Sequence, residues 1–259
     1  KIDLNADVNT YLTDFKIPAT YPQPVTMLDL MSHSAGFAET TVGDSTYDST
    51  VFTSLGIYLK NHIPARIYPP GKVVLYSNYG ASLAGYIVEQ VSGEPYEQYL
   101  AEHIFKPLGM VHSTAYQPVP EQFAANLSRS YTFDGTYHEL PFLLLEINPA
   151  GGMSASGADM GRFMLAHLQD GANKGATLLP ETIRLMHAQS FAFDPAMTGF
   201  SHGFAEWKIN GRKLIGHGGH IPEFISEMRL LLDEKVGIYV SYNTLIAADD
   251  RTAMIDAFM

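Results

Sequence analysis

Residues 204–242 read FAEWKINGRKLIGHGGHIPEFISEMRLLLDEKVGIYVSY, and this stretch decides the fold. Its first two runs, Phe204–Ile209 and Arg212–Ile215, lie on either side of Asn210-Gly211. Asn-Gly is the strongest short hairpin signal, because a two-residue turn of this type needs positive φ at both positions. The stretch therefore begins with a predicted β-hairpin.

A second hairpin is predicted directly downstream. Its strands are the runs Phe224–Leu232 and Val236–Tyr242, which are separated by Asp233-Glu234-Lys235. Residues 249–258 then carry a helical pattern. The C-terminal part is thus predicted to be an antiparallel meander followed by a helix.

Upstream of the meander the apolar residues recur at helical spacing. Helices are predicted over residues 26–32, 48–59 and 79–92, and from Pro95, Ser156 and Pro180 onward. Thr26 and Asp48 are the candidate N-caps of the first two helices, and Gly93 ends the third.

These elements predict an α+β fold, a layered α/β arrangement with an antiparallel sheet flanked by helices and a mainly helical lobe. We expect a single domain over residues 1–259. Its sheet-side lobe would comprise about 1–70 and 200–259, and its helical lobe about 71–199.

Composition narrows the function classes. Of the 259 residues 46% are hydrophobic, which is an ordinary globular balance, and the net charge of −11 argues against nucleic acid as a partner. No cysteine is present, so disulfides, thiol catalysis and cysteine-ligated metals are excluded. No apolar run is long enough to span a bilayer, and no metal-binding motif occurs, so we predict no membrane span, no metal and no cofactor.

Tyr76-Ser77-Asn78 is the first stretch with chemical potential. A tyrosine hydroxyl can relay a proton if nearby cations lower its pKa, and an asparagine amide can both donate and accept. Such a pair can replace a histidine base in a serine enzyme. The plainer alternative is a buried tyrosine beside a loop asparagine.

His217-Gly218-Gly219 is the second such stretch. It follows one predicted strand and precedes another, and its glycines allow a backbone to approach a ligand closely. The strand edge there can offer an N–H to a developing oxyanion. The plainer alternative is a tight glycine turn with an incidental histidine.

In combination these stretches resemble the class C β-lactamase, D,D-peptidase and esterase branch of the serine β-lactamase and penicillin-binding superfamily. The resemblance spans residues 3–245 and is carried by blocks in the family's order, which are LDLMSHSAGF at 28–37, YPPGKVVLYSNYG at 68–80, FKPLGM at 105–110 followed by His112-Ser113-Thr114, PAGGMSASGADM at 149–160 and GHGGHIPEF at 216–224.

The resemblance implies a serine hydrolase that acts on an ester, peptide or β-lactam through an acyl-serine, with a periplasmic or secreted location expected and a cytoplasmic one left open. The family works with S-x-x-K, a Tyr or Ser motif ending in Asn, and K-T-G or H-x-G. The implied catalytic residues are Tyr76, Asn78 and His217. The implied substrate and oxyanion contacts are Ser77, Gly218, Gly219 and His220.

The first of those elements is missing, because no serine of the chain has a lysine three residues on. We expect that the chain begins after S-x-x-K, so that the nucleophile lies outside it and residues 1–259 alone are inactive. The alternatives are a homologue that lost the nucleophile and serves as a binding or regulatory module, or an inert fragment. A dimer, or an N-terminal segment, is expected to cover the sheet edge.

Two departures from the family bear on the substrate. His217 replaces the lysine of true β-lactamases, and a histidine is half-neutral at pH 7, which favours an esterase or peptidase-like activity. Glu223 stands where the family usually has glycine. It either disfavours anionic substrates at the site entrance or is a solvated loop residue.

Overall fold

The computed structural model describes residues 1–169, 178–244 and 248–258. Its helices are η1 (Val8–Thr10, 3₁₀), α1 (Met27–Met31), α2 (Leu55–Asn61), α3 (Asn78–Ser92), α4 (Tyr96–Leu100), η2 (Ala101–Phe105, π), α5 (Lys106–Leu108), α6 (Glu121–Ala124), α7 (Asn148–Gly151), α8 (Gly157–Leu168), α9 (Pro180–His187) and α10 (Ala248–Phe258). Its strands are β1 (Ser45–Thr46), β2 (Ser113–Thr114), β3 (Ser130–Phe133), β4 (Tyr137–Leu140), β5 (Leu144–Leu145), β6 (Ser154–Ala155), β7 (Ala205–Ile209), β8 (Arg212–His220), β9 (Ile225–Leu231) and β10 (Val236–Tyr242).

The main sheet is the predicted meander. Its strand order is β10-β9-β8-β7, and every neighbouring pair is antiparallel. Asn210 and Gly211 have φ of 49° and 80°, so both residues of the first turn have the positive φ that the Asn-Gly signal predicted. Both predicted hairpins are confirmed.

The second strand of the meander, β8, is longer than predicted. It runs on to His220, through the glycines for which a tight turn was the plainer alternative. At Gly216 a Cβ atom would lie 1.9 Å from the carbonyl oxygen of Met228 on β9. The glycines therefore let two backbones pair closely instead of breaking the strand.

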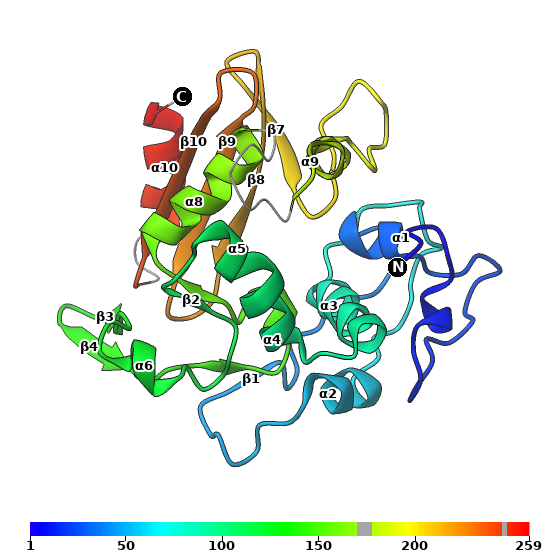
Figure 1. Cartoon of the computed structure of the whole chain (residues 1–259), viewed down its shortest axis with the longest axis horizontal. Coiled ribbons are helices and arrows are strands. Elements are labelled where there is room, and N and C mark those ends of the chain that lie inside the picture. Colours follow the sequence, from blue (N-terminus) through cyan, green and yellow to red (C-terminus); the bar gives the residue numbers. More distant parts are fainter. Residues whose placement is uncertain (170–177, 245–247, 259) are drawn as a thin grey trace.

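Helices cover the two faces of this sheet (Figure 1). On one face Gly237 of β10 faces α8, because a Cβ there would lie 3.0 Å from the sulfur of Met164. On the other face Arg251 of α10 pairs with Glu227 of β9. Three layers result, helix, sheet and helix, as the predicted layered fold requires.

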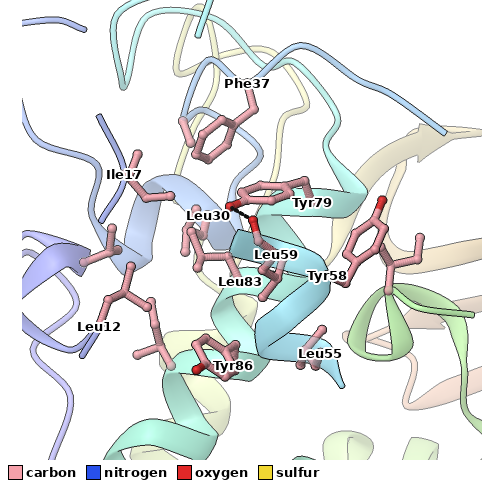
Figure 2. Packing of buried hydrophobic residues seen from close by; sticks show 14 of the residues in the cluster. Leu12, Ile17, Leu30, Phe37, Leu55, Tyr58, Leu59, Tyr79, Leu83 and Tyr86 are labelled. Atoms are coloured by element: carbon pink, nitrogen blue, oxygen red, sulfur yellow. Dashed lines mark hydrogen bonds between the residues drawn. The ribbon is translucent and has the colours of Figure 1, made fainter. Parts of the chain in front are cut away.

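Buried side chains form two clusters. One lies between the main sheet and α8. The other lies around α3, away from the main sheet (Figure 2). Leu83 and Ile87 of α3 are fully buried there, against Leu12 and Leu59 from the first part of the chain. The Tyr79 hydroxyl donates to the carbonyl oxygen of Leu59 at 3.1 Å, so a polar tip within this cluster is satisfied.

The two clusters divide the chain differently from the expected lobes. Residues 8–59 share one cluster with α3, and α8 shares the other with the main sheet. The physical reason is that the apolar sides of the first 60 residues turn toward α3, whereas α8 turns its apolar side to β10. The assignment of residues 1–259 to one domain stays a prediction.

Local capping signals predicted most helix ends correctly. Thr26 and Asp29 form a capping box at α1, and Gly93 ends α3 with a φ of 73°. The predicted cap at Asp48 is wrong, because α2 begins at Leu55. The Asp48 carboxylate instead accepts from the Thr50 N–H and hydroxyl in a local turn, which competes with helix formation.

One hairpin was missed within the part predicted to be helical. Strands β3 and β4 pair across the three-residue loop Asp134-Gly135-Thr136, where Gly135 has a φ of 109°. Asp-Gly is itself a hairpin signal, so the sequence did contain the information. Among the described residues, none of the helices has the length and apolar character that crossing a membrane requires.

Candidate active site

The predicted site residues meet at one cavity of about 1730 Å³. Tyr76 precedes α3, Asn78 is the first residue of α3, and the predicted residues from His217 to His220 lie at the end of β8. Of the seven predicted site residues, six line this cavity, namely Tyr76, Asn78, His217, Gly218, Gly219 and His220. Segments that are about 140 residues apart in the sequence therefore share one site.

Ser77 is the exception. It is 2% exposed, and its hydroxyl accepts from the N–H of Gly80 at 3.0 Å as the N-cap of α3. It is not among the residues that line the cavity. The geometry therefore gives Ser77 a structural role in place of the expected contact with substrate.

The Tyr76 ring lies close to two imidazoles. Its centroid is 4.1 Å from that of His33, in a stacked arrangement, and 6.0 Å from that of His217. The Tyr76 side chain keeps 39% of its surface exposed, so it borders the cavity while its ring is held. The role of His33 as a support for Tyr76 was missed by the sequence reasoning.

Electrostatics at Tyr76 differ from the expectation. Burial, and after it the charge of Glu39, raises the pKa of Tyr76, whereas a proton relay was expected to have a lowered pKa. Burial and the neighbouring His217 lower the pKa of His33 to about 4, and burial lowers that of His217. Both imidazoles are therefore neutral at pH 7 and provide no positive charge to stabilise a phenolate.

Hydrogen bonds fix the tautomer of each imidazole. His33 Nδ1 accepts from the N–H of Ser77 at 3.2 Å, so its proton is on Nε2. His217 Nδ1 donates to the carbonyl oxygen of Gly218 at 2.7 Å, which leaves Nε2 of the neutral ring as an acceptor. His217 can therefore accept a hydrogen bond from a hydroxyl at the cavity.

Glu39 orients Asn78 and was also missed by the sequence reasoning. Its carboxylate accepts from the Asn78 backbone N–H at 3.0 Å and from Asn78 Nδ2 at 2.7 Å. The amide nitrogen is thereby engaged, and Oδ1 is left as the acceptor. No local signal points to this pair, because the two residues lie 39 positions apart.

The end of β8 is held by its neighbours. A Cβ on Gly219 would lie 2.5 Å from the Ser226 hydroxyl, and one on Gly218 would lie 2.8 Å from a Glu227 carboxylate oxygen. Arg251 donates to the carbonyl oxygens of Gly219 and Ser226 at 3.1 and 3.3 Å. This strand end is therefore a fixed backbone surface, which suits electrostatic stabilisation of a developing charge.

Glu223 is not a solvated loop residue. It is 2% exposed and lines the cavity, and its Oε1 accepts from the Tyr47 hydroxyl at 2.7 Å. Nowhere in residues 1–169, 178–244 and 248–258 do three His, Asp or Glu side chains gather as ligands for a metal ion. That the reaction needs no metal or cofactor stays a prediction.

Comparison with known proteins gives one family model, Beta-lactamase, which matches residues 1–257. A putative D-alanyl-D-alanine carboxypeptidase of Escherichia coli (strain K12) is 32% identical over 121 residues, which is 42% of this chain and 27% of that protein. The putative penicillin-binding protein PbpX of Bacillus subtilis (strain 168) is 29% identical over 165 residues, which is 63% of this chain and 39% of that protein. The chain thus spans about a third of the length of the curated relatives it matches.

Solved structures show the same fold. An octameric penicillin-binding protein homologue from Pyrococcus abyssi superposes with a TM-score of 0.78 at 22% identity, over 94% of this chain and 57% of that one. A D-amino acid amidase from Ochrobactrum anthropi SV3 superposes with a TM-score of 0.72 at 23% identity, over 93% of this chain and 68% of that one. The predicted β-lactamase/transpeptidase-like fold is confirmed.

Proposed function

The chain belongs to the Beta-lactamase family, and from that premise we propose that the full-length protein is a serine hydrolase that cleaves an amide or ester through an acyl-serine. One observation carries the proposal. A single cavity is lined by Tyr76, Asn78 and the end of β8, which are the groups needed to move a proton, to position a partner and to hold an oxyanion.

Each residue has a role that its geometry supports. Tyr76 transfers the proton between the nucleophile and the leaving group. His217 tunes Tyr76 by accepting a hydrogen bond at Nε2. Asn78 presents Oδ1 to a donor, because Glu39 engages its nitrogen. The N–H of His220, at the end of β8, serves as one oxyanion donor.

The nucleophile is proposed to lie outside residues 1–259, in an S-x-x-K element, because no serine of the chain has a lysine three residues on. That lysine would also supply the positive charge that is needed to lower the pKa of Tyr76. Burial and the carboxylate of Glu39 otherwise keep the phenol protonated, and the two neutral imidazoles do not offset them. Residues 1–259 alone are then inactive.

The proposed substrate is a peptide, amide or ester. Relatives named as a carboxypeptidase and a neighbour named as an amidase support this choice. Burial lowers the pKa of His217, so the side chain lacks the fixed charge that a β-lactam carboxylate prefers. At most weak β-lactamase activity is therefore expected.

Covalent labelling tests the proposal. The full-length protein is treated with a fluorescent penicillin and with a p-nitrophenyl ester, and the labelled residue is found by peptide mass mapping. We expect an acylated serine outside residues 1–259, and no adduct when those residues are treated alone. A label on a serine within residues 1–259 would place the nucleophile elsewhere than proposed.

The second candidate function is a non-catalytic binding or regulatory module. The absence of S-x-x-K from residues 1–259 is the observation that favours it. It would be supported if the full-length protein binds the penicillin reversibly and is labelled by neither reagent. The periplasmic or secreted location, and the covering of the sheet edges at β7 and β10 by a dimer or an N-terminal segment, stay predictions.

A further inference from the structure

Glu223 is a buried carboxylate with an unsatisfied oxygen. It lies in the turn from Ile221 to Phe224 that joins β8 to β9. Its Oε1 accepts from Tyr47, but Oε2 has no hydrogen-bond partner among the residues that the structure describes. Burial of an ionised carboxylate costs several kcal/mol unless a cation or further donors compensate it. Glu223 therefore calls for a positively charged partner.

The cavity next to Glu223 is negatively charged as a whole. Its lining residues include three acids, Asp44, Glu139 and Glu223, one arginine, Arg129, and, within the described residues, no lysine. Arg129 is already paired with Glu139 at 2.7 Å. Asp44 and Glu223 thus have no cation of the cavity lining to balance them, and a cationic ligand is favoured over an anionic one.

The position of Glu223 specifies where on the ligand the charge belongs. Glu223 follows His220 by three residues, and both line the cavity. His220 marks the strand end at which the proposed function places the carbonyl of the cleaved bond. A carboxylate on the adjoining turn would then face a group that flanks that carbonyl. Tyr47, which engages the other oxygen of Glu223, is not part of the lining.

Building on the proposed function, we propose that Glu223 binds the free ammonium group of the substrate, so that the protein acts on amides or esters of amino acids whose amine is unblocked. The ammonium donates to Oε2 and supplies the missing positive charge. β-Lactams and other substrates with a carboxylate near the cleaved bond are disfavoured, because that carboxylate would be repelled by Glu223.

A pair of substrates tests the inference in the full-length protein. D-alanine p-nitroanilide carries the ammonium group, and its N-acetyl derivative does not. We expect kcat/KM to favour the free amine by about 10- to 100-fold, the range expected for one hydrogen bond to a charged group. Glu223→Gln should bring the ratio close to one.

Glu139→Gln is the matched control. It removes the same unit of negative charge from the same cavity lining, but from a carboxylate that is already paired. It should leave the preference for the free amine in place. If Glu139→Gln and Glu223→Gln reduce the preference equally, or if wild type shows none, the assignment to Glu223 is overturned.

A binding measurement separates this inference from the proposed function. D-alaninamide and N-acetyl-D-alaninamide are titrated into the full-length protein, and the shifts of backbone amide resonances are followed by NMR. Tighter binding of D-alaninamide, centred on residues 220–224, would support the ammonium site even if the full-length protein hydrolyses neither anilide. Equal binding of the two ligands to the unaltered chain would overturn it without any variant that could fail to fold.

Discussion

The two walls of the cavity are built in different ways. The wall before and at the start of α3 depends on side chains that meet from distant segments, since His33 supports Tyr76 and Glu39 holds Asn78. The wall at the end of β8 depends on backbone pairing with β9 and on glycines that permit it. We therefore predict that side chains of the α3 wall can be altered without unfolding the protein, whereas the β8 wall is part of the main sheet.

Gly216→Ala should break the β8 wall and have the largest effect. Its Cβ would lie 1.9 Å from the carbonyl oxygen of Met228, so the sheet must shift. We expect the free energy of unfolding to fall by about 3 kcal/mol, the upper end for overpacking. Urea unfolding of residues 1–259 measures it. Gly161→Ala in α8 is the control, since a Cβ there meets no atom within 4 Å; equal stability of the two variants would refute the argument.

Tyr76→Phe should break the chemistry of the other wall and leave its structure intact. The stacked ring remains, and the hydroxyl that transfers the proton is lost. We expect a loss on the order of 10²-fold in the rate of the full-length protein, the usual size for a general acid–base group. Tyr137→Phe, on the exposed hairpin β3–β4, should keep the full rate. An unchanged rate for Tyr76→Phe would remove this residue from the mechanism.

Glu39→Gln should have the smallest effect of the three variants, because it keeps a side chain of the same shape. It tests whether the α3 wall can lose activity without losing stability. Asn78 loses a charged acceptor, and we expect about a 10-fold lower kcat with little change in KM, roughly the value of one hydrogen bond to a charged group. Unfolding by urea should change little, since Glu39 is exposed. A fall in stability as large as that of Gly216→Ala would show that both walls are structural.

The same variant has a pH signature that a purely structural role would not produce. The negative charge of Glu39 raises the pKa of Tyr76, because a nearby anion disfavours the phenolate. Removal of that charge should move the deprotonation of Tyr76 to lower pH. Burial remains as the first cause, and the neighbouring His33 and His217 stay neutral. Tyrosine 13Cζ resonances of residues 1–259, assigned through Tyr76→Phe, report the shift, and a higher pKa would contradict it.

Local chemistry made much of the fold predictable from the sequence. The turn at Asn210-Gly211 and the helix ends at Thr26 and Gly93 depend on the φ preferences and hydrogen bonds of a few adjacent residues. Where two local signals compete, the same reasoning fails. Asp48 offers a cap, but it forms its own turn with Thr50. The Asp134-Gly135 hairpin was overlooked although its signal was present.

The meander and the family were predictable from the sequence alone, because they depend on patterns within short segments, whereas the roles of the site residues stay predictions. Only the tertiary structure decided which groups support them. His33 stacks on Tyr76, and Glu39 accepts a hydrogen bond from Asn78. Tyr47 donates a hydrogen bond to Glu223, which lies 176 positions away in the sequence. Such contacts arise when packing of the whole chain brings distant segments together, and no local propensity encodes them. For the same reason, only the folded chain shows how deeply each side chain is buried. Burial in turn raises the pKa of Tyr76 and leaves an oxygen of Glu223 without a partner.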